Sequence, residues 1–130
     1  MIVIDASALL AVLLEEADAA LFDDCMVDAD AGIMTPVNYW EARVRLENTF
    51  GPEGCELLDS YMASMSISVV AIGPDVANSA AAAAQAYGRG TPAKLNLGDC
   101  FAYALAKEEN LPLLFKGDDF SKTDVVSVLA

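Results

Sequence analysis

The 130-residue chain contains no histidine, only seven basic residues and only three cysteines. The absence of histidine excludes Ser-His-Asp and Cys-His catalysis, histidine-ligated zinc and imidazole acid–base chemistry. The cysteines are odd in number, widely spaced and form no CxxC motif, so we expect reduced thiols. Any hydrolytic chemistry therefore depends on carboxylates, Lys, Tyr, Ser or a metal ion held by oxygen atoms.

The scarcity of basic residues leaves a net charge of −13, because 20 residues are acidic. This charge argues against a passive nucleic-acid binder, which needs a basic surface. Many of the acids fall between residues 15 and 30, where we expect solvated helix faces. The few basic residues near the later acids suit an anionic substrate that meets a metal ion; we single out Arg89, Lys94 and Lys116.

The length and the 55% apolar composition predict one folded domain that spans residues 1–130. The apolar start, Met1 to Leu14, is too short to cross a bilayer, is interrupted by Asp5 and lacks a basic leader. We therefore expect a cytoplasmic protein that does not contact a membrane.

Short apolar runs alternate with helical patterns along the chain. We expect strands at residues 2–4, 32–35, 67–72, 113–115 and 125–128, and helices at 7–14, 17–27, 36–50, 53–64, 76–87 and 100–108. This alternation predicts an α/β fold in which a parallel sheet of about five strands lies between helices.

Two acids of the first third of the chain lie at unusual positions. Asp5 directly follows the first strand, at the edge where open α/β sheets bind ligands, although it equally fits the N-cap of the next helix. The core-facing stripe of the helix after Pro36 is predicted to be Val37, Trp40, Glu41 and Val44. A buried, ionised Glu41 is costly unless it is paired or binds a metal. The alternative is a surface pair between Glu41 and Arg45.

The stretch from Leu95 to Phe120 supplies further acids. Asp99 is expected at the start of a helix, where capping alone would explain it, and Asp118 and Asp119 follow the strand at 113–115. Carboxylates that converge repel one another unless a cation neutralises them. Oxygen ligands indicate Mg²⁺ or Mn²⁺, which can activate water for attack on a phosphodiester.

Several segments together resemble the PIN-domain family, and most closely the VapC-type toxins of bacterial type II toxin–antitoxin pairs. They are Asp5-Ala6-Ser7-Ala8-Leu9, Tyr39-Trp40-Glu41, Leu95 to Ala106, and Leu113 to Phe120 with Thr123-Asp124. The resemblance covers essentially the whole chain in order. Its Leu-Asn-x-Gly-Asp-Cys and Lys-Gly-x-Asp-Phe segments are specific.

The resemblance implies a PIN-like three-layer sandwich and a Mg²⁺- or Mn²⁺-dependent endoribonuclease that cleaves RNA. It further implies inhibition by a small antitoxin protein, and a homodimer or a toxin–antitoxin hetero-oligomer. It assigns the catalytic acids as Asp5, Glu41, Asp99 and Asp119. Of these, Asp5, Asp99 and Asp119 would hold the metal, and Glu41 would complete the site and help to orient or deprotonate the attacking water.

The resemblance also assigns supporting roles. Ser7 matches the polar residue two positions after the first acid, and Asp118 fills the variable position of the Gly-x-Asp-Phe pattern, where it would assist through water. RNA contacts are expected from Arg89, Lys94 and Lys116. The family's Asn or Thr near the fourth acid has no counterpart in this sequence, so either one or two metal ions are compatible with the pattern.

Two other classes of protein remain open at this point. A haloacid-dehalogenase-like phosphatase would use Asp5 as nucleophile and Gly117-Asp118-Asp119 as its metal motif, but Ser7 stands where that family has a second Asp. A non-catalytic acidic interaction module would explain the negative charge. It would not explain Glu41 on an apolar stripe.

Overall fold

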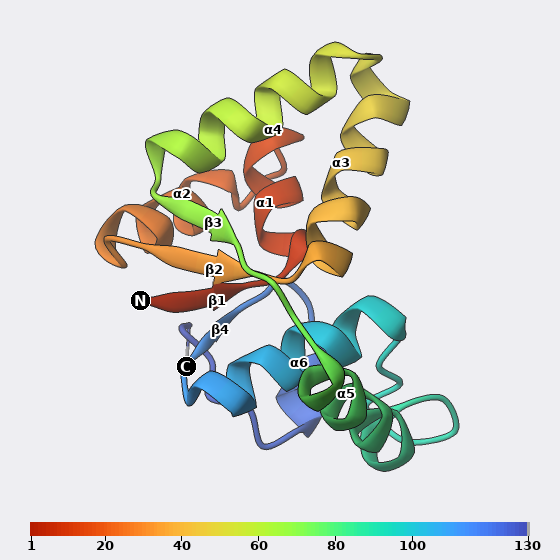
Figure 1. Ribbon diagram of the computed structural model, residues 1–130. Coiled ribbons are helices and arrows are strands. Elements are labelled where there is room, and N and C mark those ends of the chain that lie inside the picture. The colour runs from red at the N-terminus through yellow and green to blue at the C-terminus, as the bar shows by residue number, and fades with distance from the viewer. Residues whose placement is uncertain (130) are drawn as a thin grey trace.

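The computed structural model describes residues 1–129, in which four strands form one parallel sheet (Figure 1). The strands are β1 (Ile2–Ile4), β2 (Gly32–Met34), β3 (Ile67–Val69) and β4 (Leu113–Leu114), in the spatial order β3-β2-β1-β4. The chain therefore winds outward from β1 to β3 and then returns to the other side of β1. Ligands of open α/β sheets bind beyond the carboxyl ends of the strands at such a switch point, here between β1 and β4.

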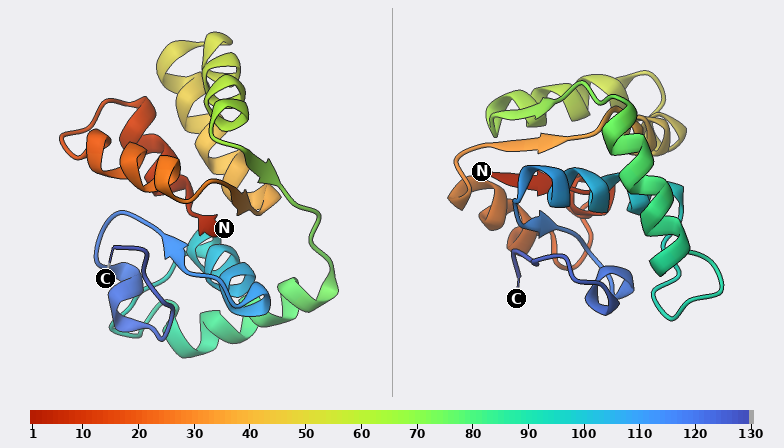
Figure 2. Two further views of the ribbon diagram at one scale, coloured as in Figure 1. Left: turned by 90° about the vertical axis from the view of Figure 1, so that its left-hand side faces the viewer. Right: turned by 60° about the horizontal axis from the view of Figure 1, so that its bottom comes forward.

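Helices cover both faces of the sheet, which gives the expected three layers (Figures 1 and 2). One face carries α1 (Ala6–Leu13), α2 (Ala19–Asp28), α3 (Pro36–Phe50) and α4 (Glu53–Ser64), and the other carries α5 (Pro74–Tyr87) and α6 (Leu97–Glu109). In β1, Ile2 and Ile4 pack into the core with α1–α4, whereas Val3 packs with α5 and α6. A strand that is buried on both faces needs a continuous apolar run, which confirms the interpretation of Ile2–Ile4.

The fifth strand, expected at residues 125–128, is reduced to a single parallel bridge between Leu113 and Ser127. Leu113 donates its amide hydrogen to the carbonyl oxygen of Val126 (2.8 Å) and accepts from the amide of Val128 (3.1 Å). Leu114, the other residue of β4, accepts instead from the amide of Asp5 (3.0 Å). Because successive strand residues face opposite edges, a two-residue strand offers only one residue to this partner.

The expected core stripe of α3 is wrong at Trp40, whose side chain is 63% exposed. The buried residues of α3 are instead Asn38, Ala42 and Leu46, spaced at i, i+4 and i+8. The stripe is therefore rotated by roughly one residue, so that Glu41 lies at its margin. Along residues 1–129, no helix is both long and apolar enough to cross a membrane.

Candidate active site

The four acids expected to act together lie on elements that meet beyond the carboxyl ends of β1 and β4. Asp5 follows β1, Asp119 begins the short 3-10 helix η1 (Asp119–Lys122) after β4, Glu41 lies in α3, and Asp99 lies in the first turn of α6. Burial is the main cause that raises the pKa of Asp5, Glu41 and Asp99, and the charges of neighbouring acids add to it. The structure thus brings the four acids into one electrostatic cluster.

Asp5 is both a helix cap and a member of this cluster. It is 5% exposed, and its Oδ2 accepts hydrogen bonds from the amide (3.0 Å) and the hydroxyl (2.6 Å) of Ser7 at the start of α1. Its Oδ1 lies 3.5 Å from the side-chain nitrogen of Asn38. Burial raises the pKa of Asp5, and the hydrogen bonds from Ser7 oppose that rise. Capping therefore occupies one carboxylate oxygen and leaves the other facing the interior of the site.

Ser7 joins the carboxyl ends of β1 and β4. Its Oγ donates to Asp5 and accepts from the backbone amide of Lys116 at 3.0 Å. The ammonium group of Lys116 pairs with Glu16 and Asp18, each at 3.0 Å. Lys116 therefore supports Asp5 through its backbone, while two acids already compensate its side-chain charge.

Asn38 ties three elements of the site together and was not identified from the sequence. Its side chain is completely buried, and its Nδ2 donates to Oε1 of Glu41 (3.2 Å) and to the carbonyl oxygen of Gly98 (3.0 Å), as well as facing Asp5. Its Oδ1 accepts from the hydroxyl of Thr35 (2.5 Å). The one available signal is its spacing, because Asn38 lies three residues before Glu41 on the same side of a helix.

Gly98 allows the carboxylate of Glu41 to approach the backbone of α6. A Cβ atom at position 98 would lie only 2.0 Å from Oε1 of Glu41. Burial and the charges of Asp5 and Asp99 raise the pKa of Glu41 to about 7, although its hydrogen bond with Asn38 acts in the opposite direction. The surface pair of Glu41 with Arg45 is not formed within residues 1–129.

Asp99 takes part in the N-terminal capping of α6 and also lies near the other acids of the cluster. The helix α6 begins at Leu97, three residues earlier than expected, because Asn96 is its N-cap. In the resulting capping box, the amide of Asp99 donates to Oδ1 of Asn96 (2.9 Å) and the amide of Asn96 donates to Oδ2 of Asp99 (3.0 Å). Burial, together with the charges of Asp5 and Asp119, raises the pKa of Asp99 to about 6, although the hydrogen bond from the amide of Asn96 acts in the opposite direction.

The structure distinguishes the two adjacent acids after β4. Both are exposed; Asp118 is the N-cap residue of η1, and Asp119 is the first residue of that helix. Besides burial, the charge of Asp119 contributes to the raised pKa of Asp5 and of Asp99, whereas that of Asp118 does not. Of the two, Asp119 is therefore the acid whose charge acts on Asp5 and Asp99.

The metal-free protein is expected to lose stability as the pH rises from about 5 to about 8. Between the ordinary pKa values of the unfolded chain and the raised values of Glu41 (about 7) and Asp99 (about 6), the folded state holds more protons. Stability therefore falls through this window and then levels off. We expect a loss on the order of 1 kcal/mol after solvent screening, or ~3–6 °C in Tm, by calorimetry in chelator.

The control for this pH dependence is Glu41→Gln, which removes one of the acids with a raised pKa. Its Tm should change less between the same pH values. An equal change of Tm with pH in the variant and the parent protein would contradict the assignment of this pH dependence to Glu41.

The donor set fits an oxygen-ligated divalent cation. Carboxylate oxygens are the ligands that Mg²⁺ and Mn²⁺ prefer. No three acidic or cysteine side chains of residues 1–129 are gathered at metal-binding distance, so the acids would have to move closer together to share a cation. The pKa values are raised first by burial and then by neighbouring acids, so the site disfavours ionised carboxylates, and a bound cation would stabilise them.

The remaining basic candidates lie in the loop between α5 and α6. Arg89 and Lys94 are exposed, and neither forms a salt bridge in the described part of the chain. Asn96 ends this loop as the N-cap of α6, and Asp99 lies in the first turn of that helix. Positive charge without an acidic partner is therefore present close to the acid cluster.

Comparison with known proteins identifies relatives over nearly the full length. The PIN domain model matches residues 2–126. A Ribonuclease VapC of Mycolicibacterium smegmatis is 43% identical over 127 residues, which cover 97% of this chain and 98% of that protein.

Two solved structures share the fold. VapC20 of Mycobacterium tuberculosis, described as a Sarcin-Ricin loop cleaving toxin, superposes with a TM-score of 0.80 at 14% identity and covers 97% of both chains. A toxin–antitoxin complex from Klebsiella pneumoniae superposes with a TM-score of 0.71 at 19% identity, covering 97% of this chain and 95% of that one. At these identities the two structures support the fold alone.

Proposed function

Because the chain belongs to the PIN-domain family and groups with the VapC ribonucleases, we propose that it is the ribonuclease toxin of a toxin–antitoxin pair. The reaction is the Mg²⁺- or Mn²⁺-dependent hydrolysis of internal RNA phosphodiester bonds. The observation that carries this proposal is the cluster of four acids at the switch point of the sheet, of which Asp119 is exposed, while burial and mutual repulsion raise the pKa of the other three. Family membership favours this function over the phosphatase and the acidic interaction module.

Asp5, Asp99 and Asp119 are the residues that would hold the cation. When bound, such a cation supplies an activated water and stabilises charge on phosphate oxygens. Glu41 contacts Gly98, the residue before Asp99. Burial raises the pKa of Glu41 to about 7 in the metal-free site, and a bound cation would favour its ionised form, which can accept a proton from the attacking water.

Other side chains keep these acids in position. Ser7 holds one oxygen of Asp5, and Asn38 holds Glu41 against α6. Asp118 is exposed beside Asp119 and would act only through water. Arg89 and Lys94 would contact the RNA backbone, whereas Lys116 would first have to leave Glu16 and Asp18.

The expected partners are RNA and a small antitoxin protein. The relative from Mycolicibacterium smegmatis is named a ribonuclease, and the structural neighbour from Klebsiella pneumoniae is a toxin–antitoxin complex. We infer a single domain that works in the cytoplasm, as a homodimer or as a toxin–antitoxin hetero-oligomer. The exposed Trp40, next to Glu41, is apolar surface that such a protein partner would cover.

Metal dependence provides the direct test of the proposed function. Purified protein incubated with RNA should produce defined internal cuts with Mg²⁺ or Mn²⁺. A chelator should remove this activity, and Mn²⁺ added in excess should restore it, because the carboxylates need a cation to bind the phosphate. Cleavage that persists in chelator, or that the Asp5→Asn variant retains, would contradict the proposal.

A further inference from the structure

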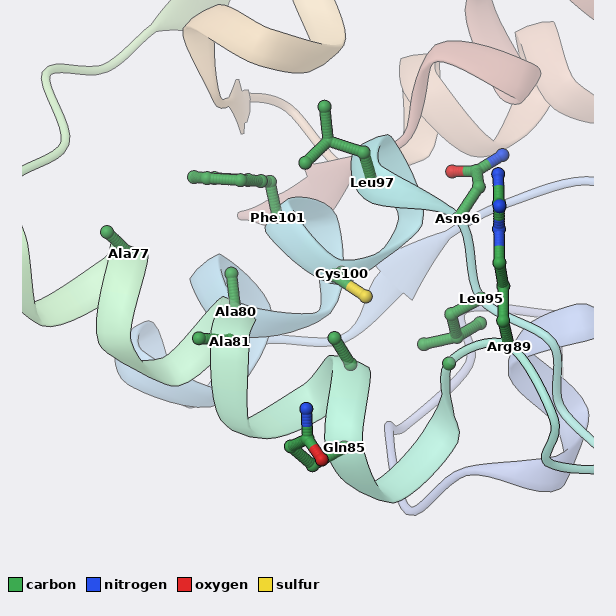
Figure 3. A pocket seen from close by; sticks show the side chains of 12 residues that line it. Ala77, Ala80, Ala81, Gln85, Arg89, Leu95, Asn96, Leu97, Cys100 and Phe101 are labelled. Carbon is green, nitrogen blue, oxygen red and sulfur yellow. The ribbon is translucent and has the colours of Figure 1, made fainter.

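A groove of about 560 Å³ lies between α5 and the beginning of α6 (Figure 3). Ala77, Ala81 and Ala84 of α5 line one side, and Leu97 and Phe101 of α6 line the other. The groove is open because the methyl groups of the alanines are too short to fill the space between the helices. Its volume lies in the range of sites that bind small molecules.

The groove reaches the part of α6 that carries an acid of the candidate active site. Asn96 lines the groove and, as the N-cap of α6, accepts the amide of Asp99 at 2.9 Å. Leu97 also lines it, is 71% exposed, and directly precedes Gly98, the residue against which Glu41 packs. Along the axis of α6 the groove therefore lies within one helical turn of Asp99, on the side of the helix that carries Leu97 and Phe101.

The charge of the groove is opposite to that of the rest of the molecule. The chain has 20 acidic residues, yet none of them lines the groove. The side chain of Arg89 extends along the rim toward Asn96 (Figure 3). Within residues 1–129, salt bridges occupy the basic groups of Arg43, Lys107 and Lys116. The other four basic residues form none, and two of these, Arg89 and Lys94, lie in the loop beside the groove.

We propose that this groove binds one nucleotide of the substrate RNA next to the phosphate that is cleaved. The base lies on the alanine surface and stacks against Phe101, and its phosphate pairs with Arg89. Aromatic side chains stack on bases, and guanidinium groups bind phosphate through paired hydrogen bonds. The amides of Gln85 and Asn96, which also line the groove, provide donors and acceptors for the base edge.

The choice of RNA as occupant rests on the proposed function and on the charge of the groove. An apolar peptide side chain would also fit between the alanines and Phe101. It would leave Arg89 without a counter-charge. A nucleotide covers the apolar surface with its base and pairs its phosphate with the guanidinium group of Arg89.

The test compares two phenylalanine substitutions on α5. Ala84→Phe fills the groove, and Ala82→Phe is the matched control, because Ala82 is exposed on the same helix and does not line the groove. With Mn²⁺ and single-stranded RNA, Ala84→Phe should raise KM by about 10-fold, since base stacking is lost, and should change the base preference beside the cut. It should leave kcat nearly unchanged, and Ala82→Phe should alter neither constant.

A second pair of variants tests the phosphate contact without requiring catalysis. Fluorescence anisotropy measures binding of a labelled single-stranded RNA to the Asp5→Asn protein, with added Arg89→Gln or, as a charge-matched control, Arg43→Gln. Arg89→Gln should reduce the slope of log affinity against log salt by ~0.7, the value of one phosphate contact on a single strand. Arg43→Gln should leave the slope unchanged.

Three results would overturn the nucleotide site. If the parent protein cleaves RNA and Ala84→Phe has the same KM and base preference as Ala82→Phe, the groove proposal fails while the ribonuclease assignment stands. If Ala84→Phe disrupts a homodimer or antitoxin binding but preserves RNA affinity, the groove is a protein interface. If the parent protein neither binds nor cleaves RNA, both proposals fail.

Discussion

Replacement of Asp5 by asparagine is expected to lower metal-dependent RNA cleavage on the order of 10³-fold without lowering thermal stability. The loss follows because a bound metal ion stabilises the transition state by several kcal/mol, and each 1.36 kcal/mol of lost stabilisation lowers the rate tenfold. Stability is preserved because asparagine keeps an oxygen that accepts the two hydrogen bonds of Ser7 at the start of α1. The substitution also removes a buried carboxyl group whose pKa is raised by that burial. Single-turnover cleavage and thermal melting of the same preparation measure both effects.

Two further substitutions make this result specific to Asp5. Asp5→Ala should lose activity equally but also ~1 kcal/mol of stability, because it removes the cap. Asp118→Asn neutralises an exposed acid at the same edge of the sheet and should retain most of the activity. Cleavage by Asp5→Asn at more than a tenth of the parent rate would rule out Asp5 as a metal ligand.

Replacement of Gly98 by alanine is expected to lower cleavage on the order of 10²-fold while the protein remains folded. A Cβ atom at this position would lie 2.0 Å from Oε1 of Glu41, so the carboxylate has to move away from the site. General-base catalysis typically contributes 10²–10⁴-fold, which sets the expected loss. The end of a flexible side chain can move at little cost, and alanine has a higher helix propensity than glycine by roughly 1 kcal/mol. The rate of cleavage and the urea midpoint of unfolding provide the two measurements.

Gly54→Ala is the matched control for this substitution. A Cβ atom at position 54 would lie 2.5 Å from backbone atoms of Leu46, so α3 and α4 would have to separate. We expect lower stability with little change in kcat for the folded protein, the reverse of Gly98→Ala. Equal rates for Gly98→Ala and the parent protein would show that the position of Glu41 does not limit the reaction.

Most of the fold followed from local patterns. The run Ile2–Ile4 and the run at Leu113–Leu114 are continuous and apolar, as strands buried on both faces require. Proline, glycine and asparagine mark the ends of the helices. The chain order then places Asp5 and Asp119 at the same edge of the sheet, because Asp5 directly follows β1 and Asp119 lies five residues after the end of β4, the parallel neighbour of β1.

Other features could not be read from the sequence, because they depend on how two elements pack. Trp40 fits an apolar helix stripe, but the rotation of α3 about its axis exposes it and buries Asn38 instead. The expected strand at 125–128 has the right composition, yet β4 offers it only one residue for pairing.

The sequence by itself determined the fold class, because strand burial and strand–helix alternation leave periodic patterns along the chain. Its motifs carried the family resemblance and, through it, the choice of the four candidate acids. Only the tertiary structure decided how those acids are held. Asn38 and Gly98 act on Glu41 across the contact between α3 and α6. Contacts between elements far apart in the chain leave no local pattern, so only the packed structure reveals them.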